Sequence, residues 1–286
     1  MYIVFALLSA LFSSITALLS KKGLKGINSH LAVLLRTTIV FFIVWGIAFV
    51  TGATEGIRLL SERNLIFLAL SGIATGISWL CYYQALAIGD VNKVVAVDKS
   101  STTLTMLIGM FFLSEAVTPF KIIGMIIMTV GTYLMLEKKD TTAKKGIRTS
   151  WLLLAILSAV FASLTSIFAK TGLSGVNSNF ATAFRTSIVL IFAALIFFLR
   201  ERHKKFYKPT KKNVIFLILS AFATGASWLC YFYALSIGEA GIVAPIDKLS
   251  VTLAIILSWI FLHERITRKS LWGLVLLTIG VILPVL

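Results

Sequence analysis

The sequence has little charge, few prolines and only two cysteines, and each scarcity excludes a class of protein. Only 13% of its 286 residues are charged, whereas soluble domains usually carry about 25%. Four prolines and few polar runs leave no room for a disordered tail. Because 58% of the residues are apolar and the mean hydropathy is +0.97, we expect a polytopic membrane protein.

The sequence also lacks the residue patterns of catalytic and metal sites. Cys81 and Cys230 lie at equivalent positions inside apolar segments, without the spacing of a metal site or of a disulfide framework. No nucleophile–histidine–acid set or phosphate-binding loop occurs, so we expect neither an enzyme nor a cofactor. The net charge of +16 comes from bases in short loops between apolar segments, and we therefore expect no nucleic-acid partner.

One stretch of the sequence occurs twice. Residues 71–89 read SGIATGISWLCYYQALAIG and residues 220–238 read SAFATGASWLCYFYALSIG, with 13 of 19 positions identical. The same offset of 149 residues relates Asp98-Lys99 to Asp247-Lys248 and persists over most of the chain without a gap. Such a register of charged and aromatic positions indicates an internal duplication.

Ten segments are long and apolar enough to cross a bilayer, which takes roughly 20 residues. They are 2–20, 31–50, 64–87, 93–113, 119–136, 151–169, 180–199, 213–236, 242–262 and 269–286. An odd number of helices per copy inserts the second copy upside down. The sequence thus predicts an all-α polytopic membrane protein with ten transmembrane helices as two inverted five-helix repeats, 1–137 and 150–286, joined by a basic linker at 138–149.

The loop charges predict the orientation in the membrane. With the four bases inside segments set aside, one face collects Arg58, Arg63, Lys121 and Lys170, and the other face collects nineteen Lys and Arg residues. Positive residues accumulate in cytoplasmic loops. We therefore expect a multi-pass protein of the cell membrane with both termini outside.

Charged residues inside membrane segments are functional candidates, because a charge at membrane depth is expensive. The duplication places three kinds here, each twice: Arg36 and Arg185, Asp98 and Asp247, Lys99 and Lys248. Four positive charges against two negative ones favour an anionic or zwitterionic solute. Adjacent residues of a helix point about 100° apart, so each aspartate needs a partner on another helix, and the two arginines are the obvious ones. These charges predict either static links between the repeats or groups that bind solute, open a gate or carry protons.

An aromatic face recurs in both copies. Trp79, Tyr82 and Tyr83 share one face of the third segment, and Trp228, Tyr231 and Phe232 repeat it. Such a face can cage a cation or stack on a planar solute, and it can also pack or lie at the interface. Because both trios lie well inside long segments, we expect them to line a cavity.

Glycines recur at heptad spacing in the fifth and tenth segments. They are Gly124 and Gly131 in the first copy, and Gly273 and Gly280 in the second. Small residues let helices approach closely in a membrane. This pattern predicts close helix contact or a homodimer through these two helices.

These residues carry a resemblance to a known family. Each half resembles the EamA-type five-helix module of the drug/metabolite transporter superfamily, on Tyr-x-x-Ala-Leu-x-x-Gly at 82–89 and 231–238 and Phe-Leu-x-Glu at 112–115 and 261–264. The resemblance covers essentially the whole chain. It implies a ten-helix transporter with a central cavity and alternating access. Family members move amino acids, metabolites, nucleotide sugars or drugs.

The chain departs from the family pattern at two places. Many relatives carry a proline in the fourth helix of each module, where this chain has Asp98-Lys99 and Asp247-Lys248, with Pro245 just before the second pair. Small multidrug exporters of the superfamily use a first-helix carboxylate, and residues 1–20 and 151–169 contain none. The missing carboxylate argues against proton-driven export of cationic drugs by that route.

The first hypothesis is a secondary transporter of a small solute, with its binding site between the repeats at the midplane of the membrane. Coupling of this transport to protons is part of the hypothesis. The alternatives are a translocase for a lipid or lipid carrier and a non-transporting membrane subunit. A closed polar cavity would favour the first, a groove open to lipid the second, and a dry core with every charge paired the third.

Overall fold

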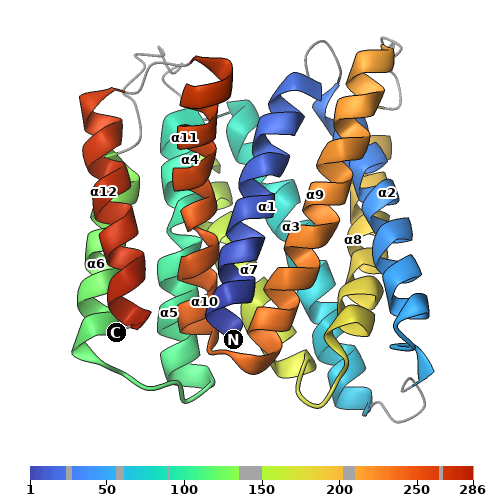
Figure 1. Ribbon diagram of the computed structural model, residues 1–286, viewed down its shortest axis with the longest axis horizontal. Coiled ribbons are helices and arrows are strands. Elements are labelled where there is room, and N and C mark those ends of the chain that lie inside the picture. The colour runs from blue at the N-terminus through green and yellow to red at the C-terminus, as the bar shows by residue number, and fades with distance from the viewer. Residues whose placement is uncertain are drawn as a thin grey trace.

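The computed structural model describes residues 1–23, 28–55, 61–88, 91–134, 150–201, 210–263 and 267–285, and within these ranges it consists of helices joined by short loops (Figure 1). The first repeat consists of α1 (Tyr2–Gly23), α2 (Ser29–Val50), α3 (Glu62–Ile88), α4 (Val91–Lys99), α5 (Ser101–Phe112) and α6 (Pro119–Leu134). The second consists of α7 (Ser150–Gly172), α8 (Ser178–Glu201), α9 (Lys211–Ile237), α10 (Ala240–Asp247), α11 (Leu249–Leu262) and α12 (Arg268–Ile282), followed by the short 3-10 helix η2 (Leu283–Val285). The linker 138–149 and Glu264 lie outside the described residues.

The expected all-α membrane fold with inverted repeats is confirmed. Eight helical segments of the described chain are long and apolar enough to span a membrane, and α6 is a shorter apolar helix. Both termini lie at the lower edge of Figure 1, so the first repeat ends at the upper face and the second repeat starts there and returns. We call the lower edge the terminal face.

The fourth and ninth crossings are broken, which corrects the expectation of continuous helices over 93–113 and 242–262. The break between α4 and α5 lies at Ser100, whose N–H donates to the carbonyl of Val97 at 3.1 Å. In the second repeat the N–H of Lys248 donates to Pro245 at 2.9 Å, the same tight turn. Pro245 lacks an N–H and clashes with the preceding turn, which weakens the helix there. Each aspartate–lysine pair therefore lies at a break between two short helices.

The two repeats interlock through equivalent helix pairs. Helix α1 packs along α9, and its counterpart α7 packs along α3, while α2 lies against α8 and α6 against α12. The backbones of α6 and α12 touch: a Cβ at Gly124 would lie 2.7 Å from the carbonyl oxygen of Gly280, and one at Gly131 2.7 Å from that of Gly273. The repeated glycines thus serve a contact inside one chain. A homodimer through these helices stays a prediction and would have to use their other faces.

Candidate functional site

A cavity of about 300 Å³ lies where the first and third crossings of each repeat meet, and we call it the central cavity. Helices α1, α3, α7, α8, α9 and α10 contribute to its wall. Seven of the residues that the sequence singles out line it: Trp79, Arg185, Trp228, Tyr231, Phe232, Asp247 and Lys248. Hydroxyl groups form most of the remaining polar wall: Ser9, Ser13, Thr75, Ser78, Thr165, Ser166 and Ser227. The volume is at the lower end of the range for small-molecule pockets, about 300–1,000 Å³.

Arg185 is the most buried charge of this cavity, with 2% of its surface exposed. Its guanidinium donates to the hydroxyls of Thr75 at 2.8 Å and Ser71 at 3.3 Å, both on α3 of the other repeat. The ring of Phe232 lies under it, with the centroid 4.2 Å from Cζ, and Trp228 lies 5.9 Å away. The guanidinium thus has neutral neighbours, and its positive charge is available to an anionic group of a solute.

Each aspartate is held by a serine of the opposite repeat. The hydroxyl of Ser9 donates to Asp247 at 2.7 Å, and that of Ser158 donates to Asp98 at 2.7 Å. Each of these serines also contacts a serine of another helix. The hydroxyl oxygens of Ser9 and Ser227 lie 3.2 Å apart, and those of the equivalent pair, Ser158 and Ser78, lie 3.3 Å apart. The two networks repeat one arrangement, but only Asp247 borders the central cavity.

The expected pairing of arginines with aspartates is wrong. Arg36 donates to the hydroxyl of Ser20 at 3.1 Å, and Arg185 donates to α3, as described above. Within the described chain, neither arginine lies at ion-pair distance from Asp98 or Asp247. Hydroxyls of α1 and α7 contact the aspartates instead, because α1 packs against α10 and α7 packs against α4.

The other predicted site residues lie outside the central cavity. Tyr82 packs beside Ala85 and Val94, in a separate apolar cluster. Tyr83 meets the ring of His30 edge-on, with centroids 5.1 Å apart. Lys99 lines a second cavity, which it shares with Lys248. Of the two aromatic trios, the one in α9 and Trp79 alone from α3 reach the central cavity. Binding roles for these residues stay predictions.

The serines were missed in reading the sequence. Ser9 and Ser158 are equivalent under the 149-residue offset, and so are Ser78 and Ser227. A hydroxyl kept at both copies of an apolar helix was the available signal. Serine at a membrane helix contact is common, so this signal alone does not mark a functional residue.

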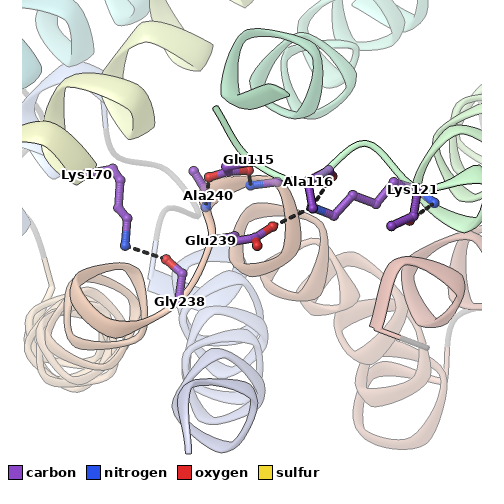
Figure 2. Close-up of polar contacts among 9 residues, drawn as sticks. Glu115, Ala116, Lys121, Lys170, Gly238, Glu239 and Ala240 are labelled. Carbon is purple, nitrogen blue, oxygen red and sulfur yellow. Dashed lines mark hydrogen bonds and ion pairs between the residues drawn. The ribbon is translucent and has the colours of Figure 1, made fainter. Parts of the chain in front are cut away.

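A network of charged groups joins the two repeats on the terminal face (Figure 2). Glu115, in the loop after α5, accepts the backbone N–H groups of Ala240 at 2.6 Å and Gly241 at 2.8 Å, at the start of α10. Lys121 forms an ion pair with Glu239 and also donates to Ala116 at 2.8 Å. An anion at a helix start is stabilised by the helix dipole. Burial raises the pKa of Glu115, and each of the two backbone N–H groups acts against this by a smaller amount.

Lys170 completes this network from α7. Its ammonium donates to the carbonyls of Gly238 at 2.7 Å and Leu235 at 2.8 Å, which end α9. Glu115, Lys170 and Glu239 all border a cavity of about 620 Å³ at this face. The network therefore ties the loop between α9 and α10 to both the first repeat and α7.

The comparison with known families agrees with this geometry. The model of the EamA-like transporter family matches residues 1–137 and 149–286. The chain belongs to the EamA-like transporter family. It is thus a multi-pass membrane protein of a transporter family, as the resemblance implied.

Several relatives of this EamA-like protein are themselves described as transporters. An uncharacterized transporter encoded in the cobO 3′ region of Sinorhizobium sp is 42% identical over 134 residues, which cover 47% of this chain and 95% of that protein. That relative has about the length of one repeat. The uncharacterized transporter YvbV of Bacillus subtilis is 30% identical over 183 residues, which cover 62% of this chain and 58% of YvbV.

A solved crystal structure has the same fold. It superposes with a TM-score of 0.80 at 15% sequence identity, over 99% of this EamA-like chain and 96% of that one. At this identity the similarity shows the fold alone. The family and the relatives' names indicate a transporter rather than an enzyme.

Proposed function

We propose that the protein is a secondary transporter that moves a small zwitterionic or anionic solute through the central cavity by alternating access. The observation that carries the proposal is the wall of this cavity, where Arg185, Lys248 and Asp247 face one space of about 300 Å³. Two positive groups and one negative group, set among hydroxyls, suit a carboxylate and an ammonium of one molecule. An amino acid has this chemistry and this size.

Each group has a place in the proposed binding mode. The solute carboxylate approaches Arg185 and Lys248, and its ammonium approaches Asp247. Trp79 and Trp228 offer aromatic faces to the ammonium or to an apolar side chain. The hydroxyls replace the water that the solute leaves behind, since polar groups without partners are costly inside a protein.

Alternating access requires the repeats to separate on one face at a time. On the terminal face, the network of Glu115, Lys121, Lys170 and Glu239 holds the start of α10 against the first repeat (Figure 2). Opening this face breaks the contacts of Glu115 with α10. The broken helices give the rearrangement a natural pivot at Lys248 and Ser100.

Asp247 is the proposed site of proton coupling. It borders the cavity and has a single hydroxyl donor, Ser9, so a proton can reach it from the solute path. Protonation removes the negative charge and weakens binding of the solute ammonium. Solute and proton would then compete for the carboxylate of Asp247, both when the cavity is open to the outside and when it is open to the inside.

The test is a solute screen with purified protein in proteoliposomes, with and without a pH gradient. The panel contains zwitterionic amino acids, the matching amines and the matching carboxylates, with Arg185→Gln as the variant. We expect uptake of zwitterions or carboxylates in wild type and its loss in Arg185→Gln. Uptake of amines alone would contradict the proposal. Movement of labelled lipid without any soluble compound would favour the translocase.

The proposed orientation, in the cell membrane with both termini outside, has its own test. A single cysteine at the exposed Ser61 on the terminal face and one at the exposed Lys212 near the start of α9 mark the two faces, in a chain without Cys81 and Cys230. An impermeant thiol reagent applied to intact cells should label position 61. Labelling of position 212 instead would reverse the orientation.

A further inference from the structure

A second cavity, of about 160 Å³, lies between the broken helices and the α6–α12 pair, and we call it the lysine cavity. Lys99 and Lys248 enter its wall from the breaks in the fourth and ninth crossings. Tyr133, which is 52% exposed near the end of α6, also lines it. The wall of the cavity therefore runs from the two helix breaks to a partly exposed residue of α6.

The two ammonium groups of this cavity are attracted by the carboxylates of Asp98 and Asp247 only from beyond ion-pair distance. Within the described chain, no acceptor lies at hydrogen-bond or ion-pair distance from Lys99 or Lys248. The nearby carboxylates of Asp98 and Asp247 already accept from Ser158 and Ser9. Two cations that face one small space repel each other, and the repulsion is strong where the surroundings are apolar.

A threonine gives a second and independent observation. Thr102 is 3% exposed and lines the lysine cavity, and its hydroxyl has no hydrogen-bond partner. Buried hydroxyls are nearly always paired in folded proteins, so an unpaired one that faces a cavity indicates a missing partner. Thr103, Thr129 and Thr132 add further hydroxyls to the same wall, the first two joined by a 2.8 Å hydrogen bond.

Ser100 also lines the cavity, with its hydroxyl donating to the carbonyl of Val97 at 2.6 Å, and the rest of the wall is apolar. It consists of Val95, Met128, Val251, Ile255 and Leu277. For comparison, an engineered apolar cavity of roughly 150 Å³ binds benzene, so a space of this size holds an oxyanion and a few carbon atoms. A longer apolar chain would have to leave past Tyr133 toward the surface.

We propose that the lysine cavity binds the oxyanion of an amphiphile, a carboxylate or phosphate whose apolar chain leaves past α6. The oxyanion bridges Lys99 and Lys248 and accepts from Thr102. Its charge relieves the repulsion between the lysines, and its oxygens supply the partner that the Thr102 hydroxyl lacks. Such a molecule comes either from the membrane or from solution. Because Lys248 borders both cavities, an occupant here would draw that ammonium away from the central cavity.

The test is calorimetric titration of the full chain in a neutral detergent with decanoate. Decanol has the same chain without the charge and serves as the ligand control. Lys99→Gln and Lys248→Gln remove one cation each, and Thr102→Val removes the hydroxyl at nearly constant shape. Lys212→Gln, at an exposed position outside the cavity, is the matched protein control. Thermal unfolding of each variant verifies that it is folded.

We expect decanoate to bind and decanol to bind at least tenfold more weakly. The decanoate Kd should rise about tenfold in each lysine variant and about threefold in Thr102→Val, and stay unchanged in Lys212→Gln. Equal binding of decanoate and decanol, or a Kd that Lys99→Gln leaves unchanged, would overturn the proposal.

Competitors identify the source of the ligand. Displacement of decanoate by butyrate or inorganic phosphate supports an oxyanion from solution. Displacement by an anionic phospholipid, with no effect of the soluble anions, supports a membrane source. Because Lys99 does not border the central cavity, solute uptake in Lys99→Gln separates the two proposals: loss of decanoate binding with uptake retained leaves the proposed transport function intact.

Discussion

Arg36 and Arg185 occupy equivalent positions of the two repeats, yet their surroundings differ. Arg185 is buried in the wall of the central cavity, donates to two hydroxyls of α3 and lies over Phe232. Arg36 donates to Ser20 and does not border that cavity. The aspartates, in contrast, accept from equivalent serines, Ser9 for Asp247 and Ser158 for Asp98. Duplication therefore preserved the polar links between the repeats. The two repeats nevertheless contribute different residues to the wall of the central cavity.

The largest expected effect comes from removing each arginine in turn. Arg185→Gln should lower solute uptake about 30-fold, which corresponds to about 2 kcal/mol, because it removes a charge-assisted contact to the solute. Arg36→Gln should lower uptake by less than about threefold. Both are measured as initial uptake rates in proteoliposomes, after gel filtration shows that the variants are folded. An equal loss of uptake in both variants would mean that Arg36 and Arg185 contribute equally to transport.

The aspartates sharpen the comparison, because they share their serine contacts and differ in access to the cavity. Asp247→Asn should abolish the dependence of uptake on a pH gradient, since it removes the carboxylate that borders the solute path. Asp98→Asn should keep this dependence. The measurement is solute accumulation at several imposed gradients. If uptake in Asp247→Asn still depends on the pH gradient, Asp247 has a structural role and does not carry the coupled proton.

The two tyrosines give a smaller contrast. The hydroxyl of Tyr231 lies 2.9 Å from that of Ser166 at the central cavity, whereas Tyr82 packs in an apolar cluster. Tyr231→Phe should raise the KM for uptake about threefold, the effect of one neutral hydrogen bond. Tyr82→Phe should leave KM unchanged. A shift in KM for Tyr82→Phe alone would place the solute on the side of the first repeat.

The smallest effects should be equal in the two repeats. Ser9→Ala and Ser158→Ala each remove the hydroxyl that holds an aspartate, and each should lower the free energy of unfolding by about 1 kcal/mol. Denaturation in mixed micelles measures both values. A large difference between them would show that the two networks are not energetically equivalent.

The fold could be predicted from the sequence in unusual detail, because the hydrophobic spans and the 149-residue repeat are strong local signals. The odd number of spans per copy indicated inversion, and the heptad glycines indicated the close contact that α6 and α12 make. The breaks at Ser100 and Lys248 were missed, since a single proline at 245 marks only one of them. Of the predicted site residues, Trp79, Arg185, Trp228, Tyr231, Asp247 and Lys248 line one cavity, and their binding roles stay predictions. The partners of the charges could not be predicted.

The sequence by itself determined the class, the number of crossings and the residue types at membrane depth, because bilayer thickness and backbone hydrogen bonding fix these within each segment. Which charges face one another was decided only by the tertiary structure. Helices of opposite repeats, far apart in the chain, supply the partners: Ser9 reaches Asp247 and Thr75 reaches Arg185. Two repeats related by duplication therefore form one cavity with unequal walls, since the partners of these polar residues come from the other repeat.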